Sequence, residues 1–332
     1  MKSVKLSVIV PVHNGAGYLL RNLPALKREI AEGEEIIVVD DASGDESFLT
    51  AQREGVAVIR MNSQSGPALA RNTGAKAARG NVFLFVDSDV VIAEGSLSRV
   101  RRFFQENPET VALIGSYDKL PFARGVVTQY RNLLHHFVHQ HSEGTPSHFW
   151  TGLGAVRREQ FFEVGGFNPE VKGIEDVEFG YRLRKKGLLI GIDKDLQGKH
   201  LKRWSFFGMV FTDVFMRAVP WTRLMLRCLK GLPSDFSLSK KARMSVVSAG
   251  IFFLSLIFSF LNPLSLLILL LSGGCFVGIN RELLRFFLRE RGFVFSLAAC
   301  FLHLLYSFYS GTAFICSYFC FITINRRSIQ GV

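Results

Sequence analysis

The first 227 residues of this 332-residue chain contain no cysteine. All five cysteines follow, at positions 228, 275, 300, 316 and 320. A disulfide framework or a cysteine-based zinc site is therefore excluded from residues 1–227, which we expect to form a reduced, cytoplasmic domain. The apolar stretch Leu6–Val12 is too short for the core of a signal peptide and leads directly into a polar turn, so we predict a first strand there.

Acidic residues are scarce toward the C-terminus. Residues 1–199 hold 25 Lys and Arg against 24 Asp and Glu, whereas residues 200–332 hold 15 against 4. The chain is 48% hydrophobic with a formal net charge of +12, and its positive excess coincides with its most apolar part. This combination indicates an anionic membrane surface as the partner. A nucleic-acid-binding protein more often has its positive charge on the folded domain.

Two long stretches, residues 245–279 and 293–324, have no charged residue. The first would form a helix of about 52 Å, longer than the ~30 Å core of a bilayer, so we expect two spans joined by a turn at Asn262-Pro263. In the second, Gly311 is a candidate break, so both three and four spans fit. Basic clusters at 240–243, 281–291 and 326–327 bracket the stretches and favour an even number of spans. Because transporters usually carry ionisable residues within their membrane spans, the lack of charge in these two stretches argues against a transporter.

Two amphipathic segments adjoin these stretches. Between Trp204 and Trp221 apolar side chains recur at helical spacing, and basic side chains follow them: Phe206, Phe207, Val210, Phe211, Val214 and Phe215, then Arg217, Arg223, Arg227 and Lys230. Residues 280–292 carry arginines on one helical face and apolar side chains on the other. We predict interfacial helices for both segments, within 205–243 and at 280–292. A helix docked on the folded domain is the alternative for the first.

The first 120 residues alternate strand and helix patterns. Strands are predicted at 6–12, 35–40, 56–60 and 81–87, and helices near 17–31, 45–54, 66–79 and 95–107. The strand segments are continuous apolar runs, which indicates burial on both faces. We therefore predict an α/β domain with a mainly parallel sheet, whose ligands bind at the carboxyl ends of the strands.

Carboxylates follow two of these strands. Asp87-Ser88-Asp89 would hold Mg²⁺ or Mn²⁺ on a diphosphate, with a solvated turn as the alternative. Asp40 and Asp41 would accept hydrogen bonds from a base N–H or a ribose hydroxyl. The segment from Gly66 to Gly74 opens a helix, so Arg71 and backbone N–H groups could face phosphate, although packing through small residues also explains it.

Further polar groups lie in the second half of the domain. Phe149-Trp150-Thr151-Gly152 precedes a short strand, and Glu175-Asp176 begins a helix, where one carboxylate could act as a general base or simply favour the helix dipole. His200 lies within a basic cluster that fits a metal, a diphosphate or lipid headgroups. The five histidines from His135 to His148 show no fixed ligand spacing beyond one i, i+4 pair. The sequence does not assign a role to His303.

As a set, these motifs resemble family 2 glycosyltransferases with a GT-A fold. The resemblance covers about residues 5–205 and rests on the order of the following segments: Pro11-Val-His-Asn14, Val39-Asp40-Asp41-Ala-Ser43, Gly66-Pro-Ala-Leu-Ala-Arg71-Asn72-Thr-Gly74, Asp87-Ser-Asp89, Gly165-Gly-Phe167 and Glu175-Asp176. The C-terminal part resembles that of membrane-anchored bacterial members.

The resemblance implies a role for each matching residue. Asp40 and Asp41, helped by Pro11 and His13, would contact the base and ribose of the donor, with Arg71 and Asp87 also on the donor side. Asp89 would be the favoured metal ligand, with Asp87 and His200 beside it. Asp176, next to Glu175, would be the catalytic base. Trp150, Arg203 and Trp204 would lie on the acceptor side. Such enzymes use Mg²⁺ or Mn²⁺ and invert the anomeric centre in one displacement.

One departure limits the resemblance. Processive polysaccharide synthases of this superfamily carry Q-x-x-R-W, whereas here Gln197 stands six residues before Arg203. This argues for transfer of a single sugar. A phosphate acceptor, largely ionised at neutral pH, needs little help from a base. The acidic pair therefore favours a hydroxyl on a lipid or lipid-linked glycan, with a polyprenyl phosphate as the alternative.

Together these observations predict three parts: a GT-A domain at 1–204, basic interfacial helices at 205–243 and a transmembrane region at 244–332. We expect a multi-pass enzyme of the inner or plasma membrane that transfers a sugar from a UDP- or GDP-sugar at the cytoplasmic face. A membrane-bound nucleotidyltransferase and a non-enzymatic membrane scaffold are the alternatives from other classes.

Overall fold

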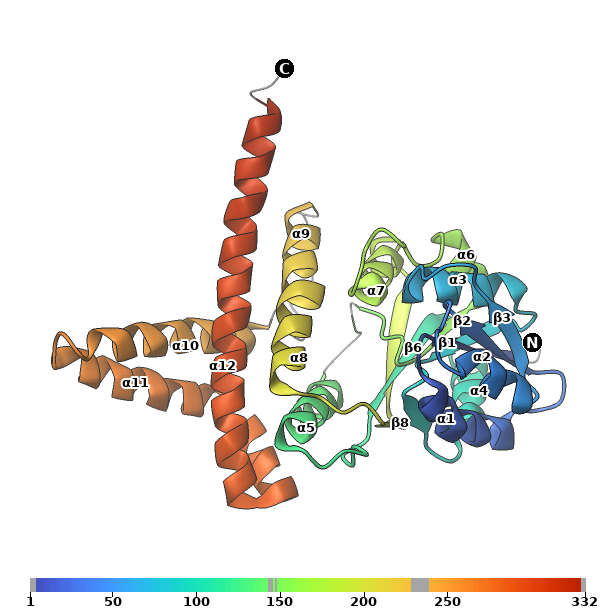
Figure 1. Ribbon diagram of the computed structural model, residues 1–332, viewed down its shortest axis with the longest axis horizontal. Helices are drawn as coiled ribbons and strands as arrows, with labels where there is room; N and C mark the ends of the chain where they lie inside the picture. The colour runs from blue at the N-terminus through green and yellow to red at the C-terminus, as the bar shows by residue number, and fades with distance from the viewer. Residues whose placement is uncertain (1–3, 143–145, 147, 228–238, 330–332) are drawn as a thin grey trace. The chain divides into compact units, whose positions relative to one another are not determined.

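The computed structural model describes residues 4–142, 146, 148–227 and 239–329 (Figure 1). The chain divides into two units. The α/β unit comprises Met1–Ala123 and Val138–Arg203, and the helical unit comprises Arg124–Phe137 and Trp204–Val332. Residues 228–238, which include part of the predicted interfacial segment with Cys228 and Lys230, lie outside the described residues.

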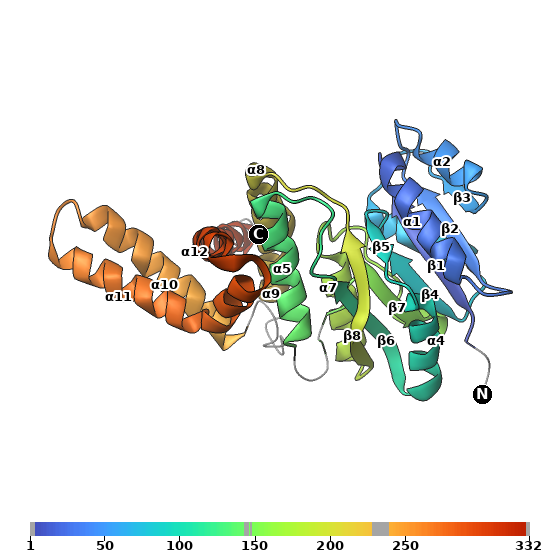
Figure 2. The same cartoon turned by 90° about the horizontal axis from the view of Figure 1, so that it is seen from below.

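The α/β unit is built on a mixed sheet, which among the described residues has eight strands in the order β3-β2-β1-β4-β7-β6-β8-β5 (Figure 2). The strands are β1 (Leu6–Val12), β2 (Glu35–Asp40), β3 (Ala57–Arg60), β4 (Val82–Val86), β5 (Val90–Ile92), β6 (Thr110–Tyr117), β7 (Leu153–Arg157) and β8 (Leu189–His200). β1, β2, β3 and β4 pair in parallel. β7 runs antiparallel to both β4 and β6, and β5 runs antiparallel to β8.

The predicted mainly parallel sheet is therefore mixed: β1 to β4 pair in parallel, and so do β6 and β8, but β7 and β5 run antiparallel to their neighbours. The prediction rested on apolar runs, and such runs report that a strand is buried on both faces, not the direction of its neighbours. β7 is fully apolar over most of its length and is still antiparallel to both neighbours. The predicted strands at 6–12 and 35–40 are confirmed to the residue.

Helices cover both faces of this sheet. α1 (Ala16–Glu29), α2 (Ser47–Arg53) and α4 (Ser96–Glu106) share one apolar core, and α3 (Pro67–Ala77), α6 (Arg158–Glu163) and α7 (Glu175–Lys185) share the other. Alternate residues of β1 serve the two cores: Val8 and Val10 lie in the first, and Ile9 lies in the second. This alternation explains why the β1 segment is apolar throughout.

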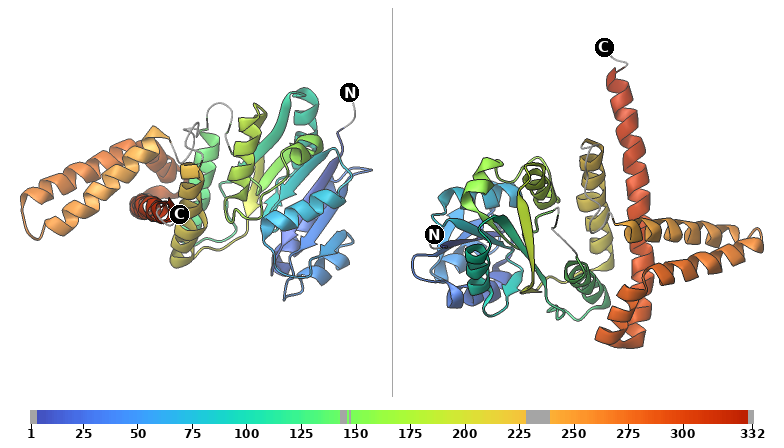
Figure 3. Two further views of the ribbon diagram at one scale, coloured as in Figure 1. Left: turned by 90° about the horizontal axis from the view of Figure 1, so that it is seen from above. Right: turned by 180° about the vertical axis from the view of Figure 1, so that it is seen from behind.

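The helical unit contains the first part of α5 (Val126–Gln140) and a series of later helices. These are α8 (Phe206–Phe211), the π-helix η1 (Thr212–Ala218), α9 (Val219–Arg227), α10 (Lys240–Phe258), α11 (Leu264–Ile279) and α12 (Arg281–Ile329). α10 and α11 form a hairpin (Figure 3) whose turn confirms the one predicted at Asn262-Pro263.

The predicted break at Gly311 is wrong. The helix continues through this residue, and the only non-helical backbone inside α12 is at Gly292, whose φ is +81°. A Cβ on Gly311 would collide with Val246 of α10, so this glycine permits close packing of two helices. Gly292 instead needs the left-handed region that glycine adopts readily. The predicted interfacial helix at 280–292 corresponds to the part of α12 before this break.

Two described helices, α10 and the Arg281–Thr323 part of α12, are long and apolar enough to cross a membrane. α11 is apolar but has only 16 residues. The most apolar windows of the two long helices are 22% and 28% buried, so most of their side chains face outward. This distinguishes them from the core helix of a water-soluble protein. Multi-pass spanning stays a prediction.

Buried polar contacts hold the helical unit together. Arg131 pairs with Asp213 at 2.7 Å, and Tyr309 donates a hydrogen bond to the same carboxylate at 2.8 Å. His303 lies between Tyr130, 3.0 Å from its Nδ1, and Asn280, 3.1 Å from its Nε2. Because both ring nitrogens have partners within the unit, a structural role explains this buried histidine.

Candidate active site

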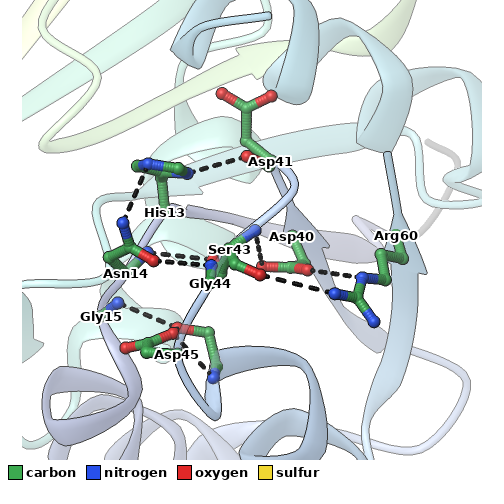
Figure 4. Close-up of polar contacts among 10 residues, drawn as sticks. His13, Asn14, Gly15, Asp40, Asp41, Ser43, Gly44, Asp45 and Arg60 are labelled. Carbon is green, nitrogen blue, oxygen red and sulfur yellow. Dashed lines mark hydrogen bonds and ion pairs between the residues drawn. The ribbon is translucent and has the colours of Figure 1, made fainter. Parts of the chain in front are cut away.

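The carboxyl ends of β1, β2 and β3 bring Asp40 and Asp41 beside His13 (Figure 4). Asp40 is fully buried; it accepts a hydrogen bond from Ser43 N at 3.3 Å and lies 3.5 Å from Nε of Arg60. Asp41 is also buried, and its backbone oxygen is 2.8 Å from Nδ1 of His13. The structure thus brings these predicted donor-side residues together, with Pro11 buried in β1 beneath them.

The carboxylate of Asp41 fixes the start of α3. It accepts hydrogen bonds from the backbone N–H groups of Ser65, at 2.7 Å, and Gly66, at 2.8 Å. Gly66 is the N-cap of α3 and Ser65 precedes it. The N–H group of Gly66, the first residue of the predicted phosphate-facing segment, therefore binds a protein carboxylate together with that of Ser65.

The turns that follow β1 and β2 have unusual backbone conformations. Asn14 and Ala42 have φ of +51° and +54°. Asn14 N donates to Ser43 Oγ at 2.9 Å, and Gly44 N donates to the Asn14 side chain at 2.8 Å, so each turn holds the other. A positive φ at alanine is strained, and such strain concentrates at functional sites.

The Asp87-Ser88-Asp89 turn joins β4 to β5, and it meets the end of β8. Nε2 of His200 lies 3.4 Å from the Asp89 carboxylate, and Leu201 N donates to the Asp89 backbone oxygen at 2.8 Å. The imidazole of His200 stacks on the ring of Tyr117, with centroids 4.3 Å apart and planes 16° from parallel. The structure thus joins Asp89 and His200, which are predicted metal ligands far apart in sequence.

The two carboxyl groups of this turn differ in acidity. Burial and the neighbouring charge of Asp89 raise the pKa of Asp87, although Arg71 opposes the change. Burial works against ionisation of Asp89 too, but its hydrogen bond to His200 and the charges of His200 and Lys202 lower the pKa of Asp89. Asp89 is therefore the stronger candidate for an ionised ligand at neutral pH.

Arg71 occupies a buried position between two carboxylates. Its Nη2 is 2.7 Å from Asp87, its Nη1 is 2.8 Å from Glu175, and its side chain is only 5% exposed. From the sequence, this arginine is a candidate phosphate contact, with helix packing through small residues as the alternative. In the structure both terminal nitrogens bind protein carboxylates, so Arg71 connects α3, the end of β4 and the start of α7.

Asp176, next to Glu175, is placed differently. Glu175 is buried against Arg71, whereas Asp176 is only half-buried. The Asp176 carboxylate accepts a hydrogen bond from Val177 N at 2.8 Å and has Thr151 N at 3.5 Å. Gly180, one turn along α7, permits this proximity because a Cβ there would collide with the backbone of Phe149. Of the two predicted base candidates, Asp176 is the more accessible.

The donor set around Asp89 suits a cation that arrives with its substrate. A carboxylate and an imidazole are ligands that Mn²⁺ accepts, and Mg²⁺ shares the preference for oxygen. Within the described part of the chain, no group of three or more His, Cys, Asp or Glu could hold a metal ion. Two protein ligands leave most of an octahedral shell to water and phosphate oxygens. The residues therefore fit a metal–diphosphate complex better than a permanently bound ion.

The predicted acceptor-side residues belong to both units. Trp150, in the α/β unit, contacts Tyr117 edge to face at 4.9 Å and His139 at 5.2 Å. Arg203 is exposed and is the last residue of this unit. Trp204 begins the helical unit, where the guanidinium of Arg131 lies over its ring at 4.3 Å.

Two of the histidines between His135 and His148 have described contacts in different units. His139 Nδ1 is 2.8 Å from the backbone oxygen of Gly115 in the α/β unit. The ring of His136 stacks on Phe286 in the helical unit. These contacts give the two side chains packing roles.

Sequence reasoning missed two residues of this site. Tyr117, the last residue of β6, and Arg60, the last residue of β3, occur in no motif that the sequence displays. The register of the sheet alone places them, because it pairs Tyr117 with Gly198 and Arg60 with Asp40.

Comparison with known proteins agrees with this geometry. Residues 7–166 match the model of glycosyl transferase family 2. An uncharacterized glycosyltransferase of Haemophilus influenzae is 26% identical over 190 residues, which cover 54% of this chain and 61% of that protein. A poly(ribitol-phosphate) beta-glucosyltransferase of Bacillus spizizenii is 36% identical over 118 residues, 33% of this chain and 19% of its own length. The matches thus span less than two thirds of these relatives.

Solved structures share the fold. The mannosyltransferase PcManGT from Pyrobaculum calidifontis, in complex with GDP-Man and Mn²⁺, has a TM-score of 0.58 at 17% identity, with 92% of this chain and 87% of that chain covered. Residues 1–349 of S. aureus TarS, in complex with UDP-GlcNAc, have a TM-score of 0.52 at 18% identity, with 91% and 90% covered. Residues 7–166 thus carry a glycosyl transferase family 2 domain, and the chain shares the GT-A fold of these solved structures.

Proposed function

We propose that this enzyme transfers a single sugar, with inversion, from a nucleoside diphosphate sugar to a hydroxyl of a membrane-associated acceptor. The observation that carries the proposal is the meeting of Asp89 with His200 at the strand ends, in a domain whose α7 also presents the accessible carboxylate of Asp176. These groups supply what the reaction needs: a site for a cation on the leaving diphosphate and a base for the incoming hydroxyl.

The comparisons support a nucleotide-sugar donor. PcManGT is solved with GDP-Man and Mn²⁺, and TarS with UDP-GlcNAc, so both nucleotides occur with this fold. For the present chain we propose a UDP- or GDP-sugar, with Asp40, Asp41, His13 and Pro11 forming the base and ribose side. The Asp41 carboxylate is occupied by the start of α3 and its backbone oxygen lies 2.8 Å from Nδ1 of His13, so we propose that the exposed ring of His13 makes the contact with the ligand here.

We propose distinct roles for the acidic residues. Asp89 and His200 would hold Mg²⁺ or Mn²⁺, and Asp87 would lie beside the same ion. The cation stabilises the negative charge that develops on the leaving diphosphate. Arg71 would position Asp87 and Glu175 from behind. Asp176 would accept the proton of the acceptor hydroxyl as that oxygen attacks the anomeric carbon from the side opposite the diphosphate.

The helical unit supports a membrane location. Among the described residues, 30 of the 36 large apolar side chains that are exposed belong to this unit. We propose that α10, α11 and the part of α12 after Gly292 enter a membrane, and that α8 to α9 lie at its cytoplasmic interface. Within α8 and η1, Phe207, Phe211 and Phe215 are spaced four residues apart and are exposed, as an interfacial helix requires. Boundaries near 204 and 243 divide the chain accordingly.

A hydroxyl acceptor fits the relatives best. The Bacillus spizizenii protein is described as acting on poly(ribitol-phosphate), and so is the TarS relative, a beta-N-acetylglucosaminyltransferase of Staphylococcus aureus. A repeat built on ribitol offers hydroxyl groups, and Asp176 suits a hydroxyl more than an already ionised phosphate. We propose a lipid or lipid-linked glycan hydroxyl as the acceptor of this chain.

Donor binding tests the proposal. Full-length protein in detergent would be screened by thermal shift with UDP-Glc, UDP-GlcNAc and GDP-Man, each with and without Mn²⁺. At one hundred times its Kd a ligand stabilises the folded state by about 2.7 kcal/mol. We expect one nucleotide class to raise the Tm in a Mn²⁺-dependent way, and we expect Asp89→Asn to remove the Mn²⁺ dependence.

Asp195→Asn is the matched control. Asp195 is an aspartate of the same unit whose side chain is 76% exposed, paired with Arg99, and its substitution should leave the shift unchanged. The proposal fails if folded protein shows no shift with any donor. It also fails if Asp89→Asn keeps the wild-type Mn²⁺-dependent shift.

A further inference from the structure

The imidazole of His200 contacts Asp89 through one ring nitrogen and an aromatic neighbour through its face. Its Nε2 faces Asp89, but among the described residues no hydrogen bond to its Nδ1 is present. Histidines that ligate metals usually donate their second ring N–H to a carboxylate or carbonyl, which fixes the ring plane. Here the phenol ring of Tyr117 lies against the imidazole, 4.3 Å away and nearly parallel.

Tyr117 is itself held in place. It is the last residue of β6, and the sheet register sets it opposite Gly198 of β8, two residues before His200. The indole of Trp150 meets the Tyr117 ring edge to face, 4.9 Å away at 88°. A ring supported by a strand and a perpendicular indole is a rigid surface for the imidazole to lie on.

We propose that Tyr117 is the positioning residue of the cation site: its ring sets the plane of the His200 imidazole so that Nε2 points at the ion next to Asp89. The terminal torsion of histidine is broad and roughly two-fold, so without a partner the ring samples orientations that turn Nε2 away. Stacking against Tyr117 removes that freedom before the metal–diphosphate complex arrives. The ring face performs this role, and the phenol hydroxyl is not needed.

This inference rests on the proposed function, because it concerns the same cation. The test measures Mn²⁺ binding by electron paramagnetic resonance of free Mn²⁺, on full-length protein in detergent with saturating UDP, and in parallel with GDP. Four proteins are compared: wild type, Tyr117→Phe, Tyr117→Leu and His200→Ala. Loss of a residue that orients a metal ligand typically weakens metal affinity 10–100-fold, so we expect about tenfold weaker binding in Tyr117→Leu. Tyr117→Phe keeps the ring and should bind as wild type does.

A double variant separates positioning from general destabilisation. In the His200→Ala background there is no imidazole to orient, so adding Tyr117→Leu should weaken Mn²⁺ binding no further. Phe103→Leu serves as a control for folding, because Phe103 is also half-buried and packs edge to face, on Phe104. This control should lower the Tm without changing Mn²⁺ affinity.

The outcomes distinguish the two claims. The inference is overturned if Tyr117→Leu binds Mn²⁺ as tightly as wild type, if Tyr117→Phe is as weak as Tyr117→Leu, or if the two losses add in the double variant. If wild-type protein binds Mn²⁺ with neither UDP nor GDP, the proposed metal-dependent function itself fails. If the wild-type protein binds Mn²⁺ with UDP or GDP and Tyr117→Leu binds it equally tightly, the proposed function stands and only the role of Tyr117 is removed.

Discussion

The α/β unit and the helical unit use buried charge in opposite ways. In the helical unit, Asp213 is closed off: its side chain is 4% exposed and both carboxylate oxygens have partners, Arg131 and Tyr309. In the α/β unit, Asp87 and Asp89 also have side-chain partners, Arg71 and His200, but their own side chains remain 32% and 20% exposed. A closed ion pair can only support packing, whereas a partly open one can still accept a ligand.

The same contrast holds for apolar surface. The α/β unit buries its large apolar side chains in two cores, while the helical unit exposes most of them. Water penalises such exposure, and lipid does not. This contrast supports the proposal that the α/β unit carries the chemistry and the helical unit the membrane attachment.

The largest effect on stability should come from the buried arginine of the α/β unit. Arg71→Met leaves Asp87 and Glu175 without their shared cation, and breaking a buried ion pair in this way costs about 3–5 kcal/mol of unfolding free energy. Thermal and denaturant unfolding of the purified protein would measure it. Arg79→Met, which removes an arginine that is 84% exposed in its ion pair with Glu35, should cost about 1 kcal/mol or less.

The corresponding test of the helical unit replaces a whole pair. If Arg131 and Asp213 serve packing alone, the double variant Arg131→Met/Asp213→Leu should unfold within about 1 kcal/mol of wild type, since apolar replacement of both partners is often neutral. Wild-type stability of Arg71→Met would contradict this division of roles between the units. An Arg131→Met/Asp213→Leu variant that is as stable as wild type but inactive would contradict it too.

A smaller effect should distinguish the two apolar surfaces. Ile251 of α10 and Leu49 of α2 are both exposed, at 43% and 46%. An aspartate near the centre of a membrane helix costs about 2.5–3.5 kcal/mol on insertion scales, whereas a surface substitution in water costs about 0.5 kcal/mol or less. Ile251→Asp should therefore reduce the fraction of protein retained in alkaline-washed membranes, and Leu49→Asp should not. Equal retention of the two variants would argue against lipid contact at α10.

Much of the α/β unit could be predicted because the relevant signals are local. Strands β1 and β2 are apolar runs ended by turn residues, and the hairpin of α10 and α11 follows from one Asn-Pro step. The direction of β7 could not be predicted, because pairing depends on partners distant in sequence. Gly292 and Gly311 look alike in sequence, and only the packing of Val246 against Gly311 separates their roles.

The candidate site was predictable in composition more than in contacts. The family resemblance selected Asp89, His200 and Asp176, and the structure places the first two in contact. It did not indicate that Arg71 would be buried between two carboxylates, because an arginine at a helix start is equally suited to a phosphate. Nothing in the sequence pointed to Tyr117, whose position depends on the register of β6 and β8.

The most direct test of the central claim is the sugar-transfer rate of Asp176→Asn. Membranes containing the full chain would receive the preferred donor with a radiolabelled sugar, and label entering the lipid or polymer fraction would be counted. A positioned general base contributes about 10²–10⁴-fold, so we expect a rate loss of that size in Asp176→Asn with donor affinity within about twofold of wild type. Wild-type transfer by Asp176→Asn, or a loss explained entirely by weaker donor binding, would contradict the assignment of the chemistry to this end of the sheet.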